Sequence, residues 1–89
     1  MSACPTDCGG SVRLGHVMCA RCWALVPKRV QHEVWRTYRA FERGAYRTKE
    51  MALAQSLAEI RPLAAEYHKA RETAIASARE RLIKRELRA

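Results

Sequence analysis

Residues 4–22, with the sequence CPTDCGGSVRLGHVMCARC, decide the fold of this 89-residue chain because they hold all four of its cysteines. Cys4 and Cys8 form a Cys-x3-Cys pair, Cys19 and Cys22 form a Cys-x2-Cys pair, and the loop of residues 9–18 joins the two. A tetrahedral metal takes four thiolate sulfurs at about 2.3 Å, which two closely spaced pairs can supply. The sequence therefore predicts one metal site with all four cysteines as ligands.

The ligand set favours one structural Zn²⁺, because four thiolates leave no open position for water or substrate. Rubredoxin-type iron also uses two cysteine knuckles, but with two intervening residues in both pairs, whereas the first pair here has three. His16 lies three residues before Cys19 and could replace one cysteine as a ligand. Two disulfides, or free or redox-active thiols, are the remaining alternatives.

The composition indicates a basic protein of the cytoplasm. Lys and Arg number 17 against 9 Asp and Glu, so the formal net charge is +8, and four thiolates holding one Zn²⁺ would lower it to +6. This balance favours nucleic acid or an acidic protein as partner. The chain shows no secretory signal and no apolar run of about 20 residues, so we expect no membrane contact. Cytoplasmic thiols stay reduced, which argues against disulfides.

The predicted fold is mostly α-helical, with a four-cysteine zinc knuckle at the N-terminus. We expect one domain over residues 1–89, comprising a zinc-binding head (1–26), a basic amphipathic helix (27–44) and a long helical region (48–88). A short, irregular hairpin is expected between the two cysteine pairs, where Gly15 could form the tip. The helical part should then contain two or three helices.

The first helix is predicted from a clear 3.6-residue period. Pro27 suits its first position and Gly44 the residue after its end, so the helix should run from about 27 to 43. The apolar face is made by Val30, Val34, Tyr38 and Phe41, with Trp35 between this face and the opposite one. The opposite face carries a basic stripe, which consists of Arg29, His32, Arg36, Arg39 and Arg43. This stripe is either a binding surface or simply the solvated side of the helix.

The long helical region should begin with Thr48 as N-cap. Pro62 interrupts its pattern, so we expect either a kink or a break there. Beyond Pro62, small residues form an alanine stripe, which consists of Ala70, Ala74, Ala78 and Leu82. The first helix is too short to cover this stripe, so the chain should fold back at Pro62 or form a homodimer through residues 63–87.

Two segments resemble a known group of proteins. They are Met18-Cys-Ala-Arg-Cys-Trp-Ala-Leu-Val-Pro-Lys and Val34-Trp35-Arg36-x-Tyr38-Arg39. The pattern is similar to small zinc-knuckle proteins of bacteriophages and actinobacteria, and the resemblance covers residues 4 to about 46. Those proteins usually carry histidine where this chain has Cys22. The resemblance implies a zinc head and a phage or mobile-element context, but no activity.

The sequence is compatible with three functions, and none of them is enzymatic. No Ser-His-Asp set, glycine-rich phosphate loop or pair of catalytic acids occurs, so we expect no small-molecule substrate. The first hypothesis is nucleic-acid binding, with Arg13 or Arg21 of the head assisting the helix. The second is a regulator or inhibitor that docks on a host protein through its C-terminal helix, and the third is a structural zinc protein whose charge only keeps it soluble. The expected nucleic-acid contacts are Lys28, Arg29, Arg36, Arg39 and Arg43.

Overall fold

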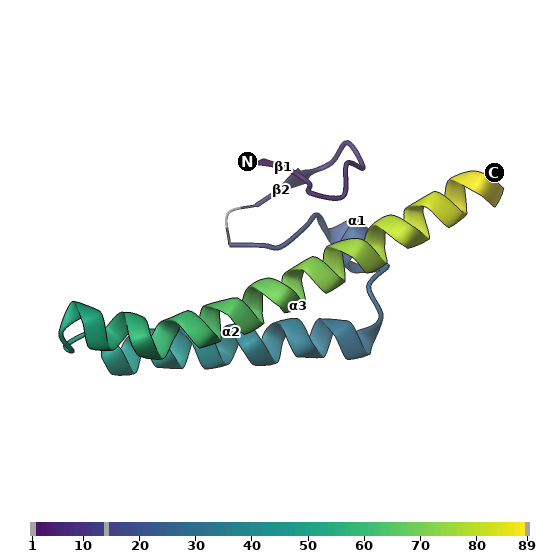
Figure 1. Ribbon diagram of the computed structural model, residues 1–89. Helices are drawn as coiled ribbons and strands as arrows, with labels where there is room; N and C mark the ends of the chain where they lie inside the picture. The colour runs from purple at the N-terminus through teal and green to yellow at the C-terminus, as the bar shows by residue number, and fades with distance from the viewer. Residues whose placement is uncertain (1, 14, 89) are drawn as a thin grey trace.

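The computed structural model describes residues 2–13 and 15–88. It confirms the predicted class: a small cysteine-rich head with a two-stranded hairpin is followed by a predominantly helical body (Figure 1). The elements are β1 (Ser2–Ala3), β2 (Ser11–Val12), α1 (Ala20–Trp23), α2 (Lys28–Thr48) and α3 (Leu53–Arg88).

The hairpin lies around the first cysteine pair and not between the two pairs. β1 and β2 are antiparallel, with Ser2 opposite Val12 and Ala3 opposite Ser11. The strands therefore enclose the Cys4–Cys8 knuckle, because that knuckle reverses the chain between them. Gly15 sits in a separate left-handed turn, with φ of 86°.

α2 and α3 form an antiparallel helical hairpin, and the chain reverses at residues 49–52 (Figure 1). α3 has 36 residues, which at 1.5 Å per residue gives about 54 Å. The longest dimension of the whole molecule is 55 Å, so α3 runs along its full length. No helix in the described chain has the length and apolar character needed to span a membrane.

α3 continues through Pro62, so of the two expected outcomes at this residue, a kink or a break, the break with a fold-back is wrong. Proline removes one helical hydrogen bond, here the one to the Ala58 carbonyl. Both Pro62 and Ala58 are exposed, and water can therefore satisfy that carbonyl. The interruption costs stability without ending the helix.

Two predicted helix ends are also wrong. Gly44 lies inside α2, where an added Cβ would come within 2.5 Å of Leu63 Cδ1 of α3. Thr48 ends α2 and does not cap α3, because its buried hydroxyl donates a 2.7 Å hydrogen bond to the Gly44 carbonyl. Both residues thus serve close packing of the two helices. Pro27, expected at the first helical position, is the residue just before α2.

The head covers the alanine stripe, so its burial requires neither of the two expected arrangements, a fold-back at Pro62 or a second chain. Ala74 and Ala78 are completely buried, and Ala70 is nearly so. They belong to one apolar cluster with residues of the head and of α2, namely Cys4, Val12, Met18, Cys22, Val26 and Val34. The homodimer stays a prediction, but an uncovered alanine stripe no longer supports it.

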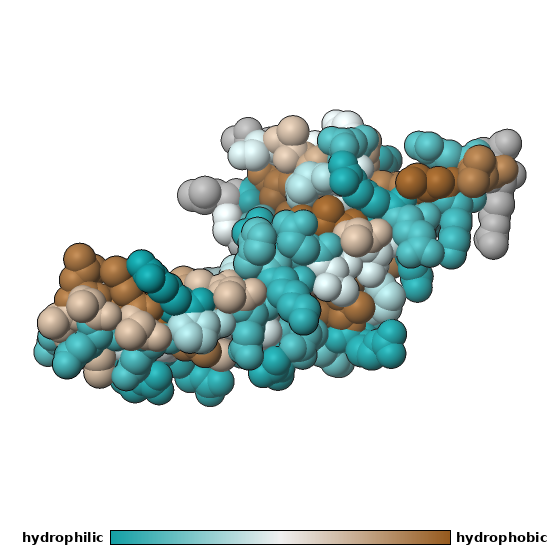
Figure 2. Space-filling view, viewed as in Figure 1, coloured by the Kyte–Doolittle hydropathy of each residue, from teal (hydrophilic) through white to brown (hydrophobic). Residues whose placement is uncertain are grey.

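Apolar side chains remain exposed at both ends of the helical hairpin. At the turn between α2 and α3 they are Tyr46, Met51 and Leu53, and Figure 2 shows apolar surface gathered at this end. Near the end of α3, Ile83 is 57% exposed and Leu87 is 81% exposed.

Because the head packs closely on α3, we expect that Ala74 cannot be replaced by a larger residue without loss of stability. Ala74→Leu should destabilise the metal-loaded protein by about 1–3 kcal/mol, because extra side-chain volume would push the head away from α3. Ala76→Leu is the matched control, since Ala76 is exposed on the same helix and its replacement should change the free energy of unfolding by less than about 0.5 kcal/mol. Urea denaturation followed by circular dichroism measures both. Equal stabilities of the two variants would contradict the packing described.

Candidate metal centre

The first cysteine pair is held by a tight knuckle of backbone hydrogen bonds. The Asp7 N–H donates to the Cys4 carbonyl at 3.1 Å, and the Cys4 N–H donates to the Gly10 carbonyl at 3.0 Å. Asp7 and Gly9 both take left-handed backbone conformations, with φ of 60° and 83°. Glycine adopts this region without a steric penalty, and aspartate tolerates it better than most residues. The knuckle points the Cys4 and Cys8 side chains to one side.

The second cysteine pair is presented by α1. Cys19 precedes this one-turn helix, and its carbonyl accepts a 2.9 Å hydrogen bond from the Trp23 N–H. Cys22 is the third residue of α1 and is completely buried. The turn of helix therefore brings both sulfurs to the side that faces the first pair.

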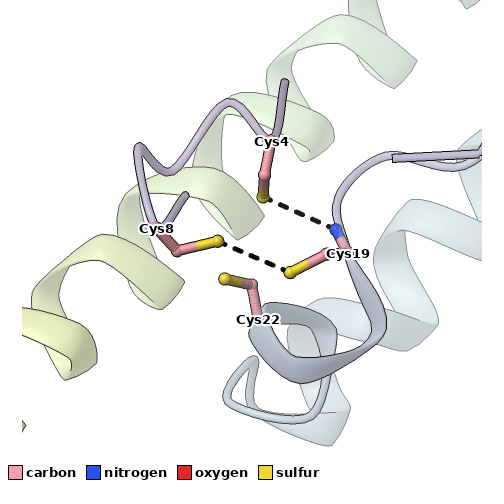
Figure 3. Close-up of side chains that lie close together, drawn as sticks. All are labelled: Cys4, Cys8, Cys19 and Cys22. Atoms are coloured by element: carbon pink, nitrogen blue, oxygen red, sulfur yellow. Dashed lines mark hydrogen bonds between the residues drawn. The ribbon is translucent and has the colours of Figure 1, made fainter. Parts of the chain in front are cut away.

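The four cysteine sulfurs form one compact cluster, as predicted. Each Sγ lies within 4.8 Å of the others, and the Cys8 and Cys19 sulfurs are 3.6 Å apart (Figure 3). Sulfurs bound at 2.3 Å to one tetrahedral metal would be about 3.8 Å apart. The cluster thus has the dimensions to hold one metal ion. His16 is exposed and does not belong to this group.

Hydrogen-bond donors surround the sulfurs. The Thr6 hydroxyl is buried 3.1 Å from both the Cys4 and the Cys22 Sγ. The Gly10 N–H donates to Cys8 Sγ at 3.4 Å, and the Cys19 N–H donates to Cys4 Sγ at 3.5 Å. Such donors stabilise thiolates and orient metal ligands.

Thr6 and Gly10 were not identified as site residues from the sequence. An added Cβ on Gly10 would lie 3.3 Å from the Cys8 and Cys19 sulfurs, so close packing at the cluster favours glycine there. The Gly9-Gly10 pair indicated a turn but not this contact. The one sequence feature that could have indicated the contact of Thr6 with the sulfurs is its position between Cys4 and Cys8.

The surroundings of the sulfurs lower the pKa of some of the thiols and raise the pKa of another. The Thr6 hydroxyl and the Gly10 N–H lower the pKa of the Cys8 thiol from its ordinary value of 9.0 to about 5. Burial raises the pKa of the Cys22 thiol to about 12. Burial also acts to raise the pKa of Cys4, but hydrogen bonds from the Cys19 N–H and the Thr6 hydroxyl outweigh it, and the net shift is downward. A metal must therefore displace a proton from Cys22, and acid should oppose its binding.

Side chains connect the head to the rest of the structure. Arg79 of α3 forms an ion pair with Asp7 in the first knuckle. Gln31 of α2 donates hydrogen bonds from Nε2 to the carbonyls of Trp23, at 2.8 Å, and Val26, at 3.2 Å. These contacts fix the head against both helices.

The basic residues predicted to bind nucleic acid lie on the exposed side of α2, away from the sulfur cluster. Lys28, Arg29, Arg36, Arg39 and Arg43 are all exposed. Arg36 forms an exposed ion pair with Glu33, three residues earlier. Arg13 and Arg21 of the head are exposed as well. The structure thus brings the cysteines together in one site and leaves the basic residues as a surface.

No protein-family model, curated protein or solved structure matches this chain, so its function has to be inferred from its own residues.

The sulfur cluster predicts a fixed metal content. Protein purified without added metal and analysed by native mass spectrometry should carry one metal ion per chain. Chelation should loosen residues 2–26, because coordination contributes directly to the folding of such sites. Hydrogen exchange before and after chelation measures the effect. A metal-free chain with protected head amides would contradict the assignment.

The hydrogen bonds of Thr6 predict a shift in the pH at which the metal is lost. Thr6→Val keeps the side-chain shape but removes the hydroxyl that lowers the pKa of Cys8. The Cys8 thiolate should then become protonated at higher pH, and the midpoint of metal release should move upward. We expect metal affinity to fall about 10- to 100-fold at neutral pH, as for other residues that support metal ligands.

Thr73→Val is the matched control, because the Thr73 hydroxyl donates a hydrogen bond to the Lys69 carbonyl on the exposed side of α3. Titration with a chromophoric chelator over a range of pH compares the variants with the wild type. Identical release midpoints in Thr6→Val and Thr73→Val would show that Thr6 does not support the ligands.

Proposed function

We propose that this protein is a small structural-zinc protein that binds nucleic acid through the basic face of α2. The observation that carries the proposal is the exposure of Lys28 and of the whole basic stripe on one helix, directly after the head. Phosphate contacts from Lys and Arg dominate nucleic-acid affinity, so a row of such residues suits this ligand.

The packing of α2 keeps the basic stripe on the solvent side of the helix. Its opposite side is buried through Val34, Thr37, Gly44 and Thr48, and the helix therefore cannot rotate about its axis. From Lys28 to Arg43 the helix rises about 22 Å, or 1.5 Å per residue. Phosphates follow one another every 3.4 Å along one strand of a duplex, so a surface of this length could meet several of them.

Zinc is the metal we assign to the site. Four cysteine ligands in tetrahedral arrangement are typical of structural zinc, and the three-residue spacing of the first pair differs from the rubredoxin-type iron pattern. Cys4, Cys8, Cys19 and Cys22 would hold the ion, which would serve to fix the head. The phage or mobile-element context implied by the sequence resemblance is part of the same proposal.

A second candidate is a regulator that docks on a host protein through the C-terminal part of α3. The exposed Ile83 and Leu87 favour it, because residues four apart lie on the same side of a helix. The alanine stripe is not available for such docking within this fold, since the head covers it.

The salt dependence of binding tests the first proposal. Each neutralised phosphate steepens the slope of log K against log salt by about 0.9 on duplex DNA. Replacing Arg36, Arg39 and Arg43 together by Gln should weaken binding and flatten the slope by about two to three units. Fluorescence anisotropy with a labelled duplex and a labelled single strand measures both quantities.

The matched control replaces Arg81, Lys84 and Arg85 of α3 by Gln, which removes the same charge from an exposed segment elsewhere. It should change the slope much less. Equal loss in both triple variants would mean that net charge alone causes binding, and no binding by the wild type at low salt would overturn the proposal. A regulator that docks through α3 should keep its partner when the α2 arginines are replaced.

A further inference from the structure

An apolar pocket opens beside the basic stripe, at the junction of the head and the helical hairpin. Its volume is about 380 Å³, which falls in the range of small-ligand sites, about 300–1,000 Å³. The head contributes Met18 and Trp23, α2 contributes Trp35 and Tyr38, and α3 contributes Tyr67. We call this site the aromatic pocket. It does not include the cysteine sulfurs.

Two of the pocket's rings are partly open to solvent. Trp35 is 49% exposed and Tyr38 is 37% exposed, although both lie next to the core. The rings of Trp35 and Tyr38 meet edge to face, with centroids 6.2 Å apart and an angle of 83°. Tyr38 and Tyr67 are tilted by 58° at 5.5 Å. The exposed part of the Trp35 ring offers a surface on which a flat ligand can stack.

A histidine and an arginine flank the exposed ring of Trp35. Residues three and four apart are neighbours on a helix surface, so His32 and Arg39 lie on either side of Trp35 along α2. Both belong to the basic stripe, and both are exposed. Glu42 is the acidic residue near Tyr38, and its carboxylate raises the pKa of the Tyr38 hydroxyl. Arg39 thus places a positive charge beside Trp35, while the lining of the pocket itself is mostly apolar and aromatic.

Proteins that bind single-stranded nucleic acids combine aromatic side chains, on which bases stack, with cationic groups that contact the phosphates. The phosphates meet the cations, and a base stacks on the aromatic side chain. In a duplex each base is paired and stacked between its neighbours, so it cannot enter a pocket unless it is flipped out at a cost of a few kcal/mol. An unpaired base enters without that cost.

We infer that the nucleic acid bound by this protein is single-stranded, and that one unpaired base occupies the aromatic pocket and stacks on Trp35 while the neighbouring phosphates contact the basic stripe. The inference rests on the proposed function and specifies its ligand. Stacking does not depend on base identity, so weak sequence preference follows.

The test uses the 89-residue, metal-loaded chain with three probes: an oligothymidylate of about 20 nucleotides, the matching oligouridylate, and a duplex of the same length. The wild type should bind the single strands more tightly than the duplex at equal salt. Trp35→Ala should weaken single-strand binding between about fivefold and 140-fold, the range that corresponds to about 1–3 kcal/mol for one stacked base. The salt slope should not change, because no charge is removed.

Tyr46→Ala is the matched control, since Tyr46 is an exposed aromatic residue on α2 outside the pocket. Its loss should leave single-strand affinity within about twofold, well below the effect of one stacked base. Trp35→Phe guards against a folding defect: it keeps a smaller ring and should give an intermediate loss, with unchanged metal content and circular dichroism.

The outcomes separate this inference from the proposal beneath it. If Trp35→Ala binds single strands as the wild type does, while the α2 arginine variant is impaired, the pocket does not take a base and nucleic-acid binding stands. Tighter binding to the duplex than to the single strands would likewise overturn the inference alone. If no probe binds at low salt, both fail.

Discussion

Four cysteine sulfurs within 4.8 Å of one another are stable as thiolates only if a cation shares their charge. The shape of the head depends on this constraint. The head contains two strands of two residues and a single turn of helix, so its own secondary structure cannot hold its shape. Thr6 and Gly10 can place their donors on the sulfurs because the cluster is compact. In the absence of a metal, burial raises the pKa of Cys22 while the Thr6 and Gly10 donors lower the pKa of Cys8, and a divalent ion removes this conflict.

The head packs on α3 through small side chains of that helix. Ala74 and Ala78 have no side chain beyond Cβ, and this allows the buried cysteines and Met18 of the head to approach the helix closely. A helix with an uncovered apolar stripe would be marginal in water. α3 is covered by α2 along one part and by the head along another, and the single chain thereby buries the alanine stripe. The ion pair between Asp7 and Arg79 lies at the edge of this contact, where it fixes orientation more than it adds stability.

The sequence predicted those features whose cause is local. Ligand spacing within each cysteine pair predicted the cluster, and the helical period predicted α2, its exposed basic stripe and the helical character of α3. Errors arose where the cause lies far away in the chain. Gly44 looked like a helix end, yet its lack of a side chain serves a contact with Leu63. The alanine stripe looked uncovered because its partner, the head, lies about fifty residues earlier in the sequence. Pro62 suggested a reversal, but only the exposure of the freed carbonyl shows why the helix tolerates it.

The proposed ligand contacts differ in how they depend on the metal. The basic stripe belongs to α2 alone, and α2 packs on α3 where Gly44 meets Leu63 and where Phe41 meets Tyr67, contacts that involve no cysteine. The aromatic pocket, in contrast, is lined by Met18 and Trp23. Met18 directly precedes Cys19, and Trp23 directly follows Cys22. Loosening the head would therefore remove the pocket wall before it removed the phosphate-binding surface. In the proposed function, the metal then contributes to how the ligand's base is seated, whereas electrostatic attraction to the strand depends on the helix.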